Sequence, residues 1–89
     1  MPQISKQKKE KISEQILAYL YSKFPQQLFT SEIAQEIARD EEFTKALLHE
    51  LEKRELVICI KKNPEGIEYS RRQRWRLSSK AQEAYSKQQ

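Results

Sequence analysis

The chain has 89 residues, of which 37% are hydrophobic and 34% charged, and these proportions suit one small domain with a heavily charged surface. No apolar run approaches the roughly 18–20 residues of a membrane span. The lysine-rich start has no apolar stretch behind it, so no secretory signal is predicted. A single cysteine, Cys59, argues against a disulfide framework and a cysteine-based zinc cage, and we expect a cytoplasmic protein.

Charge is distributed unevenly along the chain. Residues 1–30 carry five basic and two acidic side chains, residues 31–56 carry four and eight, and residues 57–89 carry eight and three, which gives net charges of +3, −4 and +5. The overall charge of +4 and the pI of about 9.3 favour a polyanionic partner. Any proposed function has to account for two basic ends around an acidic middle.

The first helix is expected to begin near Ser5 and to run to about Lys23, because the residue before Pro25 is pushed out of the α region. Apolar residues recur at three- and four-residue spacings from residue 12 onward. We therefore assign residues 12–24 to the core-forming part of this helix and residues 1–11 to a basic N-terminal arm.

Two shorter helices are expected next. After a short extended segment at residues 28–29, Thr30 is predicted to cap a helix over residues 30–38. Asp40 is predicted to cap another over residues 41–54, with acidic residues in its first turn, where the helix dipole favours negative charge. This third helix is expected to bury Thr44, Leu47, Leu48 and Leu51.

From residue 56 the apolar period changes to two, which predicts a β-hairpin over residues 56–77. We expect Val57 to face Leu77 and Cys59 to face Trp75 on the core side, with residues 63–71 as a long loop. A tight turn around residues 63–66, which would pair Lys62 with Ile67, is the alternative register. Beyond the hairpin, Ser79 and Gln82 predict a capping box for a last helix over residues 79–86.

Three short motifs occur in order along the chain. TSEIAQEI (30–37) resembles the pattern T-x-x-I-A-x-x-I/L, LHELEKRELV (48–57) resembles L-x-x-L-x-x-x-G-L-V, and WRLSSKA (75–81) resembles Y-x-L-T-x-x-G. With this order and spacing, the chain resembles the winged helix-turn-helix superfamily of transcription regulators over roughly residues 12–86. The resemblance implies one α+β, mostly helical domain over residues 1–89. It would have a three-helix core, a two-stranded β-wing and a short C-terminal helix, and it would bind double-stranded DNA.

The chain departs from the family pattern at three places. Glu55 and Ala81 stand where the family has glycine, which bears on backbone detail. The predicted recognition helix opens with Asp40, Glu41 and Glu42, and carboxylates at the end of a reading helix repel phosphates. This acidic tip argues for shallow insertion into the groove or for a partner other than DNA.

The arginine-rich wing is the main predicted DNA contact. Arg72, Arg74 and Arg76 alternate along a strand, so they share the face opposite Trp75 and Leu77. Guanidinium groups suit phosphates and narrow minor grooves. A solvated strand face is the plainer interpretation, but four arginines within six residues exceed what solubility requires. The predicted DNA-contacting residues are Lys45, His49, Lys53, Lys61, Lys62, Arg71, Arg72, Arg74 and Arg76.

The other candidates have plainer explanations. The four-residue steps from Lys45 to His49 and Lys53 fit a phosphate-facing stripe, but they fit an ion-paired, solvated helix surface equally well. His49 is the only histidine and has no other ligand types around it, so no metal is predicted. Cys59 and Trp75 are expected in the core. Since no nucleophile–base set, phosphate loop or carboxylate pair is visible, we predict neither an enzyme nor a cofactor.

Three functions are compatible with these features. We prefer a DNA-binding transcription regulator. The alternative is a winged-helix protein–protein interaction module that uses the acidic helix-turn-helix face. Binding of RNA or single strands ranks last, because Tyr69 is the only obvious exposed aromatic beside the basic residues. We also predict a homodimer through Leu17, Tyr21 and Tyr85, which exceed what the core needs; in the monomeric alternative Leu17 and Tyr21 lie under the arm.

Overall fold

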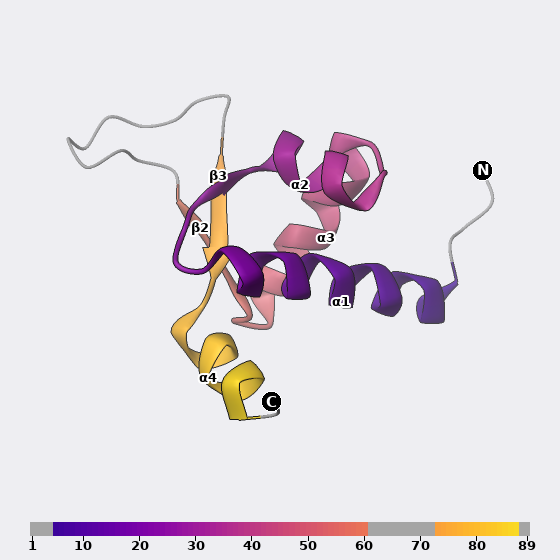
Figure 1. Ribbon diagram of the computed structural model, residues 1–89. Helices are drawn as coiled ribbons and strands as arrows, with labels where there is room; N and C mark the ends of the chain where they lie inside the picture. Colours follow the sequence, from indigo (N-terminus) through magenta and orange to yellow (C-terminus); the bar gives the residue numbers. More distant parts are fainter. Residues whose placement is uncertain (1–4, 61–72, 88–89) are drawn as a thin grey trace.

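The computed structural model of the protein describes residues 5–60 and 73–87, and Figure 1 shows helices arranged around a small sheet. Within these residues the elements are, in order, α1 (Lys6–Lys23), β1 (Leu28–Phe29), α2 (Thr30–Ile37), α3 (Glu41–Lys53), β2 (Val57–Ile60), β3 (Arg74–Leu77) and α4 (Ser79–Lys87). This order confirms the predicted, mostly helical α+β fold. None of these helices has the length and apolar character that a membrane crossing requires.

Helix α1 begins earlier than the core-forming pattern. The Ser5 hydroxyl accepts a hydrogen bond from the Lys8 backbone N–H at 3.2 Å, which satisfies one of the unpaired N–H groups at a helix start. Residues 6–11, which we assigned to an arm, are therefore the first turns of α1. The helix stops at Phe24, the residue before the proline.

The starts of α2 and α3 differ from each other in how they are capped. Thr30 was predicted to be the cap of α2, but it is the first helical residue, and the cap position is Phe29. The Phe29 backbone N–H donates to Glu32 Oε1 at 2.9 Å. In α3 the prediction is confirmed, because Asp40 Oδ1 accepts from the Phe43 N–H at 2.7 Å.

The sheet is antiparallel with strand order β1–β3–β2. Val57 pairs with Leu77 and Cys59 with Trp75, which confirms the predicted hairpin register. The sequence predicted a two-stranded wing, and the structure adds β1 on the other side of β3, where Leu28 pairs with Trp75. The predicted loop at residues 63–71 lies outside the described residues.

The core lies between α1, the α2–α3 pair and the sheet. Its largest fully buried side chains include Trp75, which lies at the centre of the sheet, together with Ile16, Leu20, Leu28, Ile33, Leu48, Leu51 and Leu77. Thr44 is also fully buried, and its hydroxyl donates to the Asp40 carbonyl at 2.8 Å. This bond removes the desolvation cost that an unpaired hydroxyl would carry.

An aromatic stack holds α4 against α1. The rings of Tyr21 and Tyr85 are stacked with centroids 5.4 Å apart, and Leu17 is buried in the core cluster that Tyr21 and Tyr85 pack against. These are the residues that we regarded as surplus to the core, and that expectation was wrong for Leu17. Burial, and next the negative charge of Glu14, raise the pKa of the Tyr85 phenol. The stabilisation linked to this shift is present below pH about 10 and is lost as the pH rises through the folded-state pKa.

Ser78 joins the wing to the last helix. Its hydroxyl accepts from the Ala81 N–H at 3.1 Å and donates to the Glu55 carbonyl at 2.9 Å, while its N–H donates to the Leu56 carbonyl at 3.0 Å. The cap of α4 is therefore Ser78 and not the predicted Ser79, because only the earlier hydroxyl also reaches the turn before β2.

Glu55 adopts the left-handed conformation that the family pattern assigns to glycine, with φ of 62°. A side chain with a Cβ costs about 1–2 kcal/mol in this region. The exposed pair that Glu55 forms with Lys80 at 3.7 Å offsets little of that cost.

Replacing Glu55 with glycine is therefore expected to stabilise the fold by about 0.5–1 kcal/mol, since the higher entropy of unfolded glycine cancels part of the gain. Glu55→Ala removes the same carboxylate but keeps the Cβ, and it should give no such gain. Urea unfolding of both variants, followed by tryptophan fluorescence, measures the difference. Equal stabilities of the two variants would show that the backbone at this position carries no strain.

Candidate nucleic-acid interface

The outward face of α3 carries charges of both signs. Its inward residues are the predicted Thr44, Leu47, Leu48 and Leu51. On the other side Glu41, Glu42, Lys45, Glu50 and Lys53 are exposed. Lys45 and Lys53 are therefore accessible to a ligand along this face, whereas the first turn presents carboxylates.

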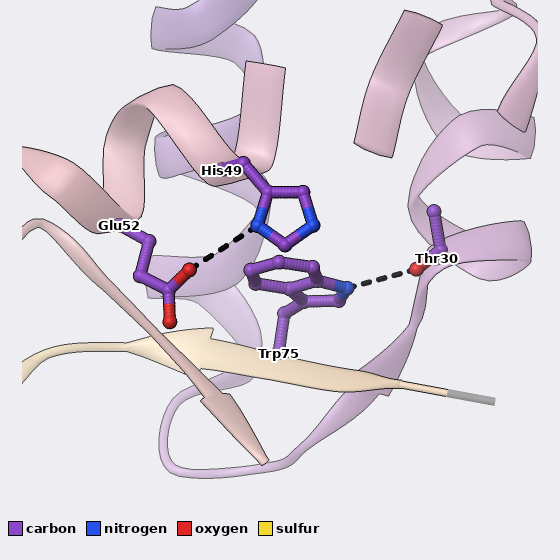
Figure 2. Close-up of polar contacts among 4 residues, drawn as sticks. All are labelled: Thr30, His49, Glu52 and Trp75. Carbon is purple, nitrogen blue, oxygen red and sulfur yellow. Dashed lines mark hydrogen bonds and ion pairs between the residues drawn. The ribbon is translucent and has the colours of Figure 1, made fainter. Parts of the chain in front are cut away.

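His49, the middle member of the predicted stripe, is engaged inside the protein. Its ring meets the Trp75 ring edge-on, with centroids 5.1 Å apart at 80°, and Nδ1 lies 3.2 Å from Glu52 Oε1. Figure 2 shows the imidazole next to the indole, with Nδ1 directed at the Glu52 carboxylate. The side chain is 39% exposed, so it offers less to a phosphate than the lysines on either side of it.

Trp75 connects β3 to both α2 and α3. It is fully buried, as predicted, and its indole N–H donates to Thr30 Oγ1 at 2.8 Å (Figure 2). Thr30 begins α2, and the His49 contact reaches α3. These contacts fix the position of β3 relative to the two helices. No local pattern predicts the role of Thr30, which lies 45 residues from Trp75 along the chain.

The wing arginines that the structure describes lie on the face opposite Trp75. Burial alternates along β3, so that Trp75 and Leu77 are buried while Arg74 and Arg76 are half-buried. The Arg74 guanidinium carbon lies 4.8 Å from the centroid of the Phe29 ring, a cation–π geometry. Arg76 Nη1 donates to the Leu77 carbonyl at 3.1 Å. Both guanidinium groups are therefore held in place next to the sheet.

Five of the nine predicted DNA-contacting residues can be placed. Lys45, His49 and Lys53 lie on α3, and Arg74 and Arg76 lie on β3. The other four, Lys61, Lys62, Arg71 and Arg72, lie outside the described residues, and so does Tyr69.

A small pocket lies where α2, α3 and the residue before β3 meet. It has a volume of about 180 Å³ and is lined by Thr30, Glu41, Glu42, Lys45 and Gln73. The first turn of α3 therefore adjoins the start of β3. Gln73 Oε1 is buried there and accepts no hydrogen bond from any described residue. Neither Gln73 nor this junction was identified from the sequence, because the residues are far apart along the chain.

Within the described part of the chain, no group of three or more histidine, cysteine, aspartate or glutamate side chains is placed to hold a metal ion.

Comparison with known proteins gave structural matches alone: no protein-family model and no curated protein matches the chain. MepR of Staphylococcus aureus in its DNA-binding conformation has 21% identity and a TM-score of 0.69, covering 85% of this chain and 53% of that chain. The MepR–DNA complex has 24% identity and a TM-score of 0.68, covering 85% and 60%. A MepR mutant bound to an oligodeoxyribonucleotide has 26% identity and a TM-score of 0.63, covering 92% and 65%.

This protein therefore spans between about half and two thirds of the length of the structures that it matches. Together with the element order, the match shows that the chain has the winged helix-turn-helix fold, in which α2 and α3 are the helix-turn-helix and β2 and β3 form the base of the wing.

Replacing Thr30 with valine is expected to destabilise the fold by about 1–3 kcal/mol, because the buried indole N–H of Trp75 loses its acceptor. Thr30→Ser keeps the hydroxyl and is the matched control, with a much smaller expected loss. Guanidinium unfolding followed by the fluorescence of Trp75, the only tryptophan, measures both. A valine variant as stable as the serine variant would show that this bond does not hold β3 against α2.

Proposed function

We propose that this protein binds double-stranded DNA as a transcription regulator, with the arginine-rich wing as the main contact and α3 in support. The main support for this proposal is the outer face of β3, where Arg74 and Arg76 are held on the same side of the strand. Trp75, which lies between them in the sequence, anchors the strand in the core. Arginine suits phosphate contacts because its guanidinium is planar and permanently charged. Solved structures of similar fold include a DNA complex.

The helix-turn-helix supplies the second part of the interface. In such proteins the second helix lies in the major groove and the first crosses the phosphate backbone. Lys45 and Lys53 are exposed on α3, and both are proposed as phosphate contacts. The carboxylate of Asp40 is engaged in capping, whereas Glu41 and Glu42 are exposed, so we expect shallow insertion of this end.

Residues that flank the described strands extend the same proposal. Lys61 and Lys62 follow β2 in the sequence, and Arg71 and Arg72 shortly precede β3. Their charges continue the run that Arg74 and Arg76 begin. We propose all four as further contacts to the phosphate backbone, which dominates the affinity of most DNA-binding proteins.

Substituting Arg74 and Arg76 together by methionine tests the wing. Methionine keeps apolar cover over Phe29 but removes both charges, so binding to every duplex should weaken. The slope of log affinity against log salt should fall by about 2, since each lost phosphate contact lowers it by about 0.9. Fluorescence anisotropy on one random duplex at several salt concentrations measures the slope.

The second candidate function is a protein-interaction module. It is favoured by exposed glutamates on α2 and α3, namely Glu32, Glu36, Glu41 and Glu42. The variant Glu41→Gln/Glu42→Gln separates the two functions in the same assay. Under the DNA proposal it should bind duplex more tightly, because two charges that repel phosphate are gone. No binding of the unchanged protein to duplex at low salt would refute the DNA proposal and favour the interaction module.

We also propose that the protein acts as a homodimer, because a two-fold regulator binds two half-sites about one helical turn apart. Leu17 is buried within the chain and is withdrawn from this interface, but Tyr21 and Tyr85 are half-buried. Sedimentation equilibrium at tens of micromolar should show a dimer, and Tyr85→Ser should shift it toward monomer. A monomer throughout that range would contradict this part of the proposal.

A further inference from the structure

The first turns of α1 are a row of lysines that extends beyond the core. Residues 6–11 read KQKKEK and carry a net charge of +3. All of them are exposed, and the first buried residue of the helix is Ile12. Figure 1 shows this end of α1 lying beyond the other elements. At 1.5 Å per residue the exposed turns add about 9 Å to the helix.

These lysines do not support the helix that carries them. The ion pairs within the described residues are His49–Glu52 and Lys80–Glu55, and neither includes a lysine of α1. The first turn of α1 has no acidic residue, although negative charge is what stabilises a helix start. Positive charge here opposes the helix dipole, so its presence calls for a reason outside the stability of α1.

Two of the four lysines share one side of this end of the helix. Lys8, Lys11 and Gln15 follow one another at three- and four-residue steps and therefore share a face. Gln15 lines the groove that α1 forms with Glu36 and Ile37 of α2. Glu10 and Glu14 line a different groove, with Arg54 and with Ala84 and Tyr85 of α4. Lys8 and Lys11 therefore lie on the side of α1 that faces α2, whereas Glu10 and Glu14 lie on the side that faces α4.

We infer that Lys8 and Lys11 form a second contact with the DNA backbone, outside the surface made by α3 and the wing. The inference rests on the proposed function. The first helix of a helix-turn-helix crosses the phosphate backbone, and in this chain that helix is α2, the one toward which these lysines lie. Lysine on a helix surface provides a flexible point charge for phosphates without reading bases. This contact accounts for the basic start of the chain, which the wing and α3 leave unexplained.

The test is the variant Lys8→Gln/Lys11→Gln, compared with Lys23→Gln/Lys87→Gln. Both variants remove two charges from exposed positions, but Lys23 and Lys87 lie in the last turns of α1 and α4. The first variant should lower the salt slope by about 2, and the control should leave it nearly unchanged. Between 50 and 200 mM salt the unchanged protein should then lose about tenfold more affinity than the first variant.

Stability provides a second readout. Removing positive charge from the start of α1 should leave the melting temperature unchanged or raise it slightly. Weaker binding together with an unreduced melting temperature therefore reports a lost contact and not partial unfolding. The loss should be the same on all duplex sequences, and it should add to that of Arg74→Met/Arg76→Met, because the two surfaces do not touch the same phosphates.

The outcomes separate this inference from the proposed function. If the unchanged protein binds duplex and the wing variant weakens it, but Lys8→Gln/Lys11→Gln behaves like its control, then the α1 contact is refuted and the DNA proposal stands. If the unchanged protein binds no duplex at low salt, both are refuted. A lower slope in the α1 variant alone supports the contact on α1 and refutes the dominance of the wing.

Discussion

A fully buried tryptophan needs an acceptor for its indole N–H, and in this protein that requirement ties the wing to the helix-turn-helix. Trp75 lies at the middle of the sheet, paired with Leu28 on one side and Cys59 on the other. Its acceptor is the hydroxyl at the start of α2. Because β3 is attached to α2 in this way, and to α3 through His49, the two surfaces proposed to contact DNA are held in one orientation.

The burial of Trp75 also decides where positive charge lies. Side chains alternate across a strand, so a buried Trp75 and Leu77 direct Arg74 and Arg76 to the other face. Slipping the pairing by one residue would place both arginines in the core, at a cost that a domain of this size could not bear. The hairpin register and the charged face are therefore one property of the sequence.

Local patterns predicted the elements that depend on local interactions. The spacing of apolar residues and the cap residue Asp40 were sufficient to predict α3 and its buried face. The alternation of apolar residues was sufficient to predict the pairing of β2 with β3. The hydroxyls were less predictable. Thr30 is a better cap residue than Phe29, but its hydroxyl binds Trp75 instead. Ser79 is as good a cap residue as Ser78, but Ser78 is the one whose hydroxyl also binds the carbonyl of Glu55. In both cases a residue far away in the sequence determines which position caps the helix.

The first turns of α1 and α3 carry charges of opposite sign. The burial of apolar residues in α1 explains how this helix forms despite the positive charge at its start. The start of α3 carries Glu41 and Glu42, which stabilise the helix end but repel phosphate. Helix α1 has 18 residues, held by Ile12, Ile16, Leu17 and Leu20, and apolar burial of this extent outweighs the unfavourable lysines at its start. A well-anchored helix can thus carry charge that suits a partner, as α1 does, whereas the first turn of α3, beside the pocket at the wing, carries charge that favours its own folding.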